Sequence, residues 1–394
     1  MKKIILLFTI ALLYGCGSNT KRHSPMPREL QDKALVLESP LIRFWGDEDP
    51  VLHRKKYYND DFTKRAKSIL DSWSGEELSF LALSGGGPNG AYGAGYLSGW
   101  SESGTRPTFH IVTGISTGAL IAPFAFLGEK YDVKLKEFYT TLSTKDLLKK
   151  RFFMAGIASD AVMSSDPLKK IIDTYISLEL MNEIAEQEKL GRVLLIGSTN
   201  MDALRPVIWN ITKIATFGTE EALNLIRDVI YASISIPIVF PPVIINTEAG
   251  GNTYEEIHAD GGVSSQVFLF PTELDWNSMT ESLDLPSKPN LYIICNDRID
   301  PVWKYTESKA TDLAARAIFS LIRTQIIGNL DQLYLLSEQN DFNYHATYVP
   351  KDFVVESQEL FDTTYMHALY NSGYEAGFSR NDWERAPPQF IDAK

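Results

Sequence analysis

The chain has 394 residues and a formal net charge of −12, with 44% hydrophobic and 22% charged residues. This composition is typical of a folded globular protein and excludes a disordered chain. No run of Lys and Arg offsets the negative charge, so the sequence predicts no binding to nucleic acid or to an anionic membrane through charge alone.

The first residues have the pattern of a secretory signal. Two lysines precede an apolar run over residues 4–13, and Leu13-Tyr14-Gly15-Cys16 follows. The run is too short to span a bilayer, which favours a signal peptide over residues 1–15. Its Leu-x-Gly-Cys ending resembles a bacterial lipobox, which implies cleavage before Cys16 and lipidation of that thiol. An ordinary signal peptide with an incidental cysteine is the alternative.

Two segments separate this signal from the first predicted strand. Residues 16–40 are predicted to be a lipidated N-terminus and tether, because much of the segment is polar and contains prolines. Gly17 and Ser18 follow the cysteine, with no aspartate. By analogy with enterobacterial sorting, we expect a lipid anchor in the bacterial outer membrane, with the protein facing the periplasm. Residues 41–74 are predicted to be an extension packed on the core, with the apolar segment 41–45 docking there.

The first predicted strand, over residues 78–83, leads into the glycine-rich loop Ser84-Gly85-Gly86-Gly87-Pro88-Asn89-Gly90. Three of its glycines match the G-x-G-x-x-G pattern of dinucleotide sites. Such a site needs an acidic residue at the end of the next strand to bind the ribose, and this chain has none there, so we predict no nucleotide site. The other function of such a loop is to point backbone N–H groups at a negative charge, and Gly86 and Gly87 are the natural donors.

The second predicted strand ends in Thr113-Gly114-Ile115-Ser116-Thr117-Gly118, and a helical pattern of small residues follows up to residue 127. In this context Gly-x-Ser-x-Gly predicts a nucleophile elbow, since the two glycines permit a strained turn that exposes the serine hydroxyl. The motif alone is too common to decide the function. Because its strand and the preceding one are neighbours in the sequence, we expect both loops at the same edge of the sheet.

The middle of the chain is predicted to be mainly helical up to residue 190. Within it, the uncharged apolar run 152–158 is predicted to line an acyl-chain channel or touch lipid, with a packed loop as the alternative. Two strands, an amphipathic helix and a proline-rich loop follow, over residues 193–198, 206–211, 220–232 and 233–242. The chain then reaches Asp260-Gly261-Gly262. An aspartate before two glycines is often a simple turn, and only the two earlier loops make it a catalytic candidate.

The last part of the chain is predicted to complete the sheet. A strand over 291–296 contains Cys295, which we expect to be a buried and inert thiol. A long helical pattern over 308–339 has apolar residues near one face, which predicts packing on the core rather than membrane binding. These residues are Leu313, Ala317, Leu321, Ile322, Ile326 and Leu330. A final strand is expected over 341–349.

Three motifs occur in order: the glycine loop 85–90, the elbow Gly114-Ile115-Ser116-Thr117-Gly118 and Asp260-Gly261-Gly262. In this order and spacing they resemble the patatin-like phospholipase family. The loop 233–242 looks like the serine- and proline-rich block of that family, and similarity reappears over 361–374.

The resemblance implies a three-layer α/β fold, with helices on both faces of a mostly parallel sheet. It assigns residues 75–380 to a patatin-like catalytic domain and residues 381–394 to a C-terminal tail. Two positions depart from the family pattern. The family commonly has an acidic residue before the glycines and an arginine four positions after the first glycine, where this chain has Ser84 and Asn89. Any anion contact made by that arginine is therefore lost, and the headgroup preference stays open.

The resemblance also implies the chemistry of a lipid acyl ester hydrolase. It makes Ser116 the nucleophile and Asp260 its base, and it assigns the oxyanion hole to Gly85, Gly86 and Gly87. A carboxylate is a weak base at neutral pH unless burial raises its pKa. Hydrolysis proceeds through an acyl-enzyme and requires no cofactor. The histidines show no metal-binding spacing, so no metal is predicted.

Two other functions are compatible with the sequence. An α/β-hydrolase esterase combines serine, aspartate and histidine, and His345 or His367 is the candidate for the third residue. His258 is predicted to lie in a loop and only to tune the site. The second alternative is a non-catalytic lipoprotein that keeps a hydrolase fold as a scaffold.

Overall fold

The computed structural model describes most of the chain from residue 22 onward, in the ranges 22–57, 68–150, 163–164, 166–270, 276–277, 285–379 and 383–391. Two sequence predictions lie outside these ranges. They are the signal peptide with the lipidation site at Cys16, and the apolar run 152–158.

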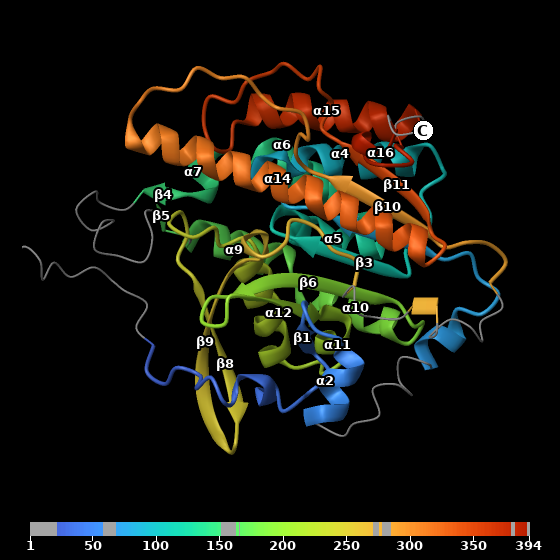
Figure 1. Ribbon diagram of the computed structural model, residues 1–394, viewed down its shortest axis with the longest axis vertical. Helices are drawn as coiled ribbons and strands as arrows, with labels where there is room; N and C mark the ends of the chain where they lie inside the picture. The colour runs from blue at the N-terminus through green and yellow to red at the C-terminus, as the bar shows by residue number, and fades with distance from the viewer. Residues whose placement is uncertain are drawn as a thin grey trace, which may run out of the picture.

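The described residues form a nine-stranded mixed sheet with a parallel centre (Figure 1). Its strands are β1 (Arg43–Trp45), β2 (Ser79–Leu83), β3 (Ile111–Ile115), β6 (Val193–Asn200), β7 (Arg205–Asn210), β8 (Val243–Ala249), β9 (Asn252–Asp260), β10 (Asn290–Cys295) and β11 (Asn343–Tyr348). The order β6-β3-β2-β10-β11 is parallel throughout, whereas β7 and β9 pair antiparallel with β6. All residues of β2 and β3 are buried, which explains their continuous apolar sequences. A separate pair is formed by β4 (Lys149–Lys150) and β5 (Met163–Ser164).

Helices cover both faces of this sheet, which confirms the predicted three-layer α/β architecture. The α-helices are α2 (Pro50–Tyr57), α4 (Gly90–Glu102), α5 (Thr117–Leu127), α6 (Asp132–Thr141), α7 (Thr144–Leu147), α9 (Asp166–Tyr175), α10 (Leu178–Glu188), α11 (Ile211–Ala215), α12 (Glu220–Ser233), α14 (Ala310–Gln339), α15 (Thr363–Ser379) and α16 (Pro388–Ile391). One core cluster joins one face of the sheet to α4, α5, α12 and α15, and a second joins the other face to α14. No helix within the described ranges combines the length and apolar character needed to cross a membrane.

The two halves of α14 differ in their surroundings. Ile326 and Leu330 are buried in the core cluster of that face, as predicted. In contrast, Leu313 is 53% exposed and Leu321 is 70% exposed. The predicted packing on the core is therefore present in the C-terminal half of α14, whereas two of the residues predicted to pack there, Leu313 and Leu321, are exposed in its N-terminal half.

Both ends of the described chain are packed more closely than the sequence predicts. The segment assigned to the tether contacts the β8–β9 hairpin from residue 24 onward, where Met26 N donates to Glu255 O and Leu35 exchanges hydrogen bonds with Glu248. Within the segment 41–74, β1 pairs antiparallel with β7. At the other end, Trp383 of the predicted tail packs against aromatic rings of the core.

Candidate active site

Ser116 occupies the turn between β3 and α5. Its φ of +52° and ψ of −122° are unusual for a residue with a side chain and indicate a strained turn. The neighbouring glycines permit this turn. A Cβ on Gly114 would lie 2.4 Å from the carbonyl oxygen of Gly118, and a Cβ on Gly118 would lie 2.3 Å from that of Leu83. The strand, sharp turn and helix predicted around this serine are therefore present, and they place its hydroxyl at the carboxyl edge of the parallel strands.

Asp260 reaches the same point from a distant part of the chain. It is the last residue of β9, which pairs antiparallel with β6 so that Asp260 lies opposite Ser198. Ser116 Oγ donates a hydrogen bond of 2.7 Å to Asp260 Oδ2. The second carboxylate oxygen, Oδ1, accepts a hydrogen bond of 2.7 Å from the N–H of Gly262. The structure thus brings together the serine and the aspartate that the sequence singled out.

The environment of this pair favours a basic carboxylate. Both side chains are buried, Ser116 being 6% exposed and Asp260 5%. Burial raises the pKa of Asp260 to about 7, although the hydrogen bonds from Ser116 and Gly262 act in the opposite direction. A carboxylate with such a pKa is half ionised at neutral pH and is a far stronger proton acceptor than an exposed aspartate.

The glycine loop lies beside the pair, and its three glycines differ in role. The N–H of Gly85 already donates to Gln266 O at 3.0 Å, so it is not available as a donor. Among the described residues, the N–H groups of Gly86 and Gly87 have no acceptor. Gly86 adopts φ +154°, and a Cβ there would lie 1.9 Å from Asn296 O, so only glycine fits. The oxyanion hole predicted from three glycines therefore narrows to two candidates.

Asn296 is a site residue that the sequence reasoning missed. It follows β10 directly and is fully buried. Its Nδ2 donates to Ser84 O at 3.0 Å, its backbone N donates to Ser84 Oγ at 2.7 Å, and its Oδ1 accepts from Gly93 N at 3.0 Å. These bonds hold both ends of the glycine loop against the neighbouring strand. A polar residue immediately after a buried parallel strand is the sequence signal that points to such a position.

Gln266 is a second missed residue and connects the glycine loop to the aspartate turn. Its carbonyl oxygen accepts from Gly85 N, and its Nε2 donates to Gly262 O at 2.8 Å. One side chain and its own backbone therefore join the two loops that surround Ser116. No local motif marks this glutamine, because its partners are distant in the sequence.

Asn89, where the family commonly has an arginine, has a structural role. Its Oδ1 accepts a hydrogen bond of 2.7 Å from Tyr365 OH, and its Nδ2 donates to Asp297 Oδ1 at 3.4 Å. The asparagine therefore connects the glycine loop to the segments that follow β10 and β11.

An apolar pocket opens next to Ser116. The residues around it come from α5, α6, α9 and the proline-rich loop, and none of these residues is charged. They are Gly87, Ser116, Thr117, Leu120, Phe138, Tyr139, Leu147, Leu168, Ile234, Ile236, Phe240 and Phe361. A second apolar cavity shares Leu120, Phe138 and Tyr139 with this pocket and continues between α5 and α9 as far as Tyr175. Both cavities are lined mainly by apolar side chains.

The histidines of the rival triad do not contact Ser116 or Asp260. His345 lies on β11 and is hydrogen bonded to Asn290 at the amino end of β10. His367 is exposed on α15. His258 lies on β9 rather than in a loop, and its ring is hydrogen bonded to Glu256 and Ser198. Within the described residues, the base available to the serine is therefore the aspartate.

Comparison with known proteins agrees with the motifs. Residues 81–272 match the family model described as patatin-like phospholipase. Among solved structures, the chain is similar to VipD from Legionella pneumophila, with 12% sequence identity and a TM-score of 0.37 over 77% of this chain and 67% of that chain. No curated protein matches the chain. The family match spans the glycine loop, the serine elbow and the aspartate turn, so residues 81–272 are similar to the patatin-like phospholipase family in the part of the chain that holds all three motifs.

Proposed function

We propose that the protein hydrolyses the acyl ester bonds of membrane lipids with a Ser116–Asp260 dyad. The observation that carries this proposal is the 2.7 Å hydrogen bond from Ser116 Oγ to a buried aspartate whose pKa is about 7. A serine hydroxyl becomes an effective nucleophile when a neighbouring base takes its proton, and no other base contacts Ser116 within the described residues.

The reaction proceeds in two steps. Ser116 Oγ attacks the ester carbonyl carbon while its proton passes to Asp260, and the resulting oxyanion accepts hydrogen bonds from the N–H groups of Gly86 and Gly87. The intermediate then breaks its bond to the leaving alcohol, which receives the proton from Asp260. A water molecule, deprotonated by Asp260, attacks the acyl-enzyme. The bond between the acyl group and Ser116 Oγ then breaks and the fatty acid leaves. The proton held by Asp260 passes to Ser116 Oγ, which restores the free enzyme.

The apolar pocket indicates the substrate class. Its lining has no charged side chain, and the neighbouring cavity between α5 and α9 is likewise apolar, which favours a hydrocarbon group over a charged one. Burial of that group fixes the carbonyl next to Ser116, which supplies part of the catalytic effect through positioning. The proposed substrate is therefore an acyl ester of a lipid.

The proposed location follows from the N-terminal sequence. Lipidation of Cys16 is supported by three features of the sequence: Lys2 and Lys3, the apolar run after them, and the lipobox-like Leu13-Tyr14-Gly15-Cys16. The anchor attaches the enzyme to the outer membrane with its domain in the periplasm, next to its lipid substrate. The test is incorporation of radiolabelled palmitate. The wild-type protein is expected to incorporate the label, and the variant Cys16→Ser is expected not to.

The test of the proposed reaction is fatty acid release from a mixed lipid extract, followed by mass spectrometry. Ser116→Ala and Asp260→Asn are each expected to lower the rate by about a thousandfold or more, because each removes one half of a unit that acts together. His367→Ala is the matched control and is expected to keep the rate. A fluorophosphonate probe should label the wild type at Ser116. Undiminished lipolysis by Ser116→Ala, or an unlabelled folded protein, contradicts the proposal.

A further inference from the structure

The N-terminal half of α14 exposes apolar side chains that a soluble helix normally buries. Leu313, Ile318, Phe319 and Leu321 are 53%, 51%, 65% and 70% exposed. They fall within about three turns of one helix, at roughly 3.6 residues per turn. At roughly 100° per residue, Ile318 and Leu321 share one face, whereas Leu313 and Phe319 lie on other sides of the helix. Single exposed apolar residues are ordinary, but a group of them on one surface marks an interaction surface.

The two arginines of this half-helix lie on its inner side, where Ile322 packs against the second core cluster. Arg316 donates to Val302 O at 2.9 Å and Arg323 donates through Nε to Ile299 O at 2.8 Å, so the arginine face lies against the protein. Ile318 and Leu321 lie on the opposite face, because the side chains of a helix advance by roughly 100° per residue. A helix on the surface of a soluble protein ordinarily turns such apolar side chains inward.

The two loops next to this half-helix are also apolar at their surfaces. Trp303 is 87% exposed and Tyr305 is 76% exposed in the segment 297–309, and Val354 is 83% exposed in the segment 350–362. Arg298 connects these segments, since its guanidinium donates to the carbonyl oxygens of Lys351 and Phe353. Tryptophan and tyrosine are the residues that favour the boundary between membrane and water. We call residues 297–324 and 350–362 together the apolar edge.

The apolar edge is continuous with the entrance of the Ser116 pocket. Phe361 lines that pocket, and Asn89 of the glycine loop is hydrogen bonded to Asp297. On α14, Gln325 accepts a hydrogen bond from Gln266 Nε2 at 3.0 Å, one turn beyond Leu321. Figure 1 shows the N-terminal end of α14 on the side of the molecule where α7 lies.

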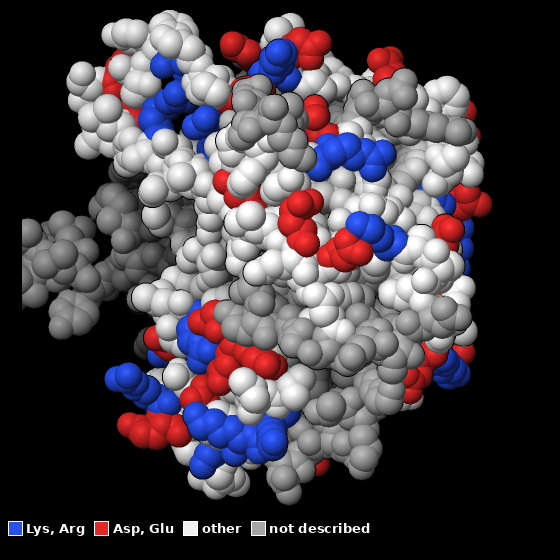
Figure 2. All heavy atoms as spheres, turned by 45° about the vertical axis from the view of Figure 1, so that its right-hand side comes forward, with Lys and Arg blue, Asp and Glu red and all other residues white. Residues whose placement is uncertain are grey.

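The charges of the apolar edge favour a lipid surface that is neutral overall. Arg298, Arg316 and Arg323 donate to backbone carbonyl oxygens of the protein itself, so they add little free positive charge to this surface. The segment 350–362 contains several acidic residues and one lysine, which disfavours an anionic bilayer. In Figure 2 basic side chains are recessed in a white surface at the upper left, the region of the α14 end in Figure 1.

We propose that the apolar edge inserts shallowly into a zwitterionic phospholipid bilayer and thereby presents the Ser116 pocket to lipid. The half-helix lies in the plane of the interface, with Ile318 and Leu321 among the acyl chains and the arginines on the side of the helix that faces the protein. Binding depends on apolar burial, so it differs from attachment through charge. The proposal rests on the proposed lipid substrate, and it goes beyond it by assigning the surface that meets the bilayer.

Insertion is tested with the full chain carrying Ser116→Ala, so that the lipid stays intact. The probe is the fluorescence of Trp303, obtained by subtracting the emission of a second protein that also carries Trp303→Phe. The vesicles consist of phosphatidylcholine whose acyl chains carry bromine as a quencher. We expect quenching that persists when the salt concentration is raised. Trp303 reports this surface itself, whatever anchors the N-terminus. Bound protein with an unquenched Trp303 overturns the proposal.

Matched variants locate the surface. The double variant Ile318→Glu and Leu321→Glu is expected to reduce the quenching and to lower hydrolysis of vesicle phosphatidylcholine about tenfold or more, because two apolar side chains no longer transfer to lipid. The control is Val133→Glu, which replaces a side chain that is 77% exposed near the start of α6. That residue lies near the end of α5 that is remote from Ser116. Equal activity of the double variant and the control on vesicles overturns the proposal.

Hydrolysis of a soluble short-chain ester separates this proposal from the proposed function. The double variant is expected to hydrolyse that ester at the wild-type rate, since none of its substituted residues lines the pocket. If the wild type hydrolyses neither ester nor vesicle lipid, the proposed function fails and the quenching experiment alone decides the docking surface. The proposal is overturned if the wild type forms a dimer that the two substitutions dissociate and Trp303 is not quenched in vesicles. That result assigns the apolar edge to contact with a second copy of the chain.

Discussion

Asp260 is the residue on which the proposed chemistry depends. An aspartate in water is almost fully ionised at neutral pH and accepts protons poorly. In this protein, burial beside Ser116 raises its pKa to about 7, and one hydrogen bond from the Gly262 N–H fixes the orientation of the carboxylate. A dyad of this kind requires no histidine, because the aspartate itself has the proton affinity that histidine ordinarily supplies.

The pH dependence of the reaction follows from this pKa. Asp260 must be ionised to take the proton of Ser116, so kcat/KM for a soluble ester is expected to rise with pH and to reach half its maximum near pH 7. Burial also raises the pKa of Asp297, to about 6, but Asp297 does not contact Ser116, so Asp297→Asn is the control and should keep the profile. A profile that is flat between about pH 5 and 9 contradicts the assignment of the base.

At the scale of elements, the packing of α4 on α15 positions the glycine loop. α4 begins at Gly90, directly after the loop, and lies so close to α15 that only glycine fits at the contact. A Cβ on Gly95 would lie 2.0 Å from Tyr370 O, and a Cβ on Gly377 would lie 2.1 Å from Tyr96 O. The small residues of both helices therefore fix the position of α4, and through it the N–H groups at its N-terminal end.

Gly377→Ala is expected to force α4 and α15 apart and to lower the free energy of unfolding by about 1–3 kcal/mol, the usual cost of an overpacked contact. The measurement is the urea midpoint at constant m-value. Gly328→Ala on α14 is the matched control, because a Cβ there meets open space. It should raise stability by about 0.5–1 kcal/mol, since alanine is the better helix former. Equal midpoints for the two variants contradict this account of the helix contact.

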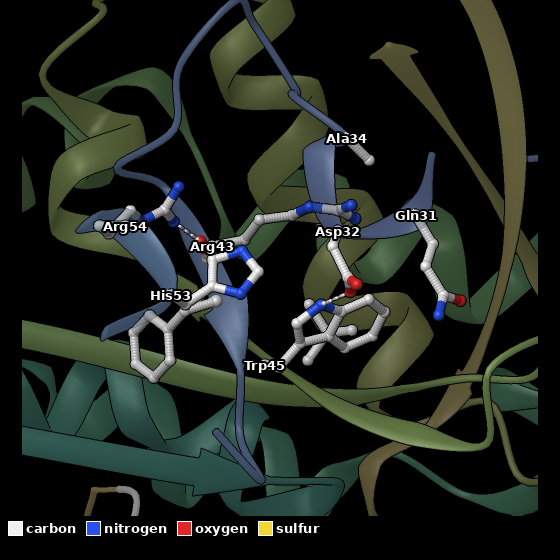
Figure 3. Close-up of a pocket in the computed structure, with 9 residues that line it drawn as sticks. Gln31, Asp32, Ala34, Arg43, Trp45, His53 and Arg54 are labelled. Carbon is white, nitrogen blue, oxygen red and sulfur yellow. Dashed lines mark hydrogen bonds between the residues drawn. The ribbon is translucent and has the colours of Figure 1, made fainter. Parts of the chain in front are cut away.

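At the scale of the whole molecule, a buried polar network joins the N-terminal extension to the strand that ends in Asp260. Arg43 of β1 donates to both carboxylate oxygens of Glu256 on β9, at 2.6 and 3.1 Å, and Glu256 is hydrogen bonded to His258. Figure 3 shows Arg43 with Trp45, whose indole N–H donates to Asp32 at 3.0 Å. The extension therefore belongs to the structure that holds the aspartate strand in place.

The network predicts sensitivity to acid. Burial alone raises the pKa of Glu256, but Arg43 and His258 outweigh it and hold this pKa well below its usual range, whereas burial lowers the pKa of His258. Both pKa values are thus lower in the folded than in the unfolded protein. The stability that they contribute is complete above about pH 6.5, the unfolded pKa of histidine, and is lost as the pH falls below it.

Glu256→Gln removes the carboxylate that receives two hydrogen bonds from Arg43 and is expected to cost about 3–5 kcal/mol at neutral pH, because a buried arginine loses its compensating charge. It should also remove the part of the decrease that begins below about pH 4.3, the unfolded pKa of glutamate, since Glu256 no longer titrates, whereas the part due to His258 remains. Urea unfolding at several pH values measures both effects. Exposed Glu359→Gln is the control. A variant as stable as the wild type at neutral pH excludes a structural role for the network.

The sequence by itself determined the chemistry-bearing loops and most of the strands. The glycines around Ser116 and before α4 permit backbone turns that are formed by residues adjacent in the sequence. The apolar runs of β2 and β3 reflect the burial of these strands on both faces of the sheet. Such features are local, so spacing reveals them. The family resemblance added the pairing of Ser116 with Asp260, which no local pattern contains.

Only the tertiary structure decided which groups meet. The hydrogen bond between Ser116 and Asp260 depends on the register of β9 against β6, and the roles of Asn296 and Gln266 depend on partners far away in the sequence. The apolar periodicity of α14 is the same whether its face meets a core or solvent, so the sequence predicted packing for some residues that are exposed. Periodicity defines an apolar face, but only the positions of the other elements determine what that face contacts.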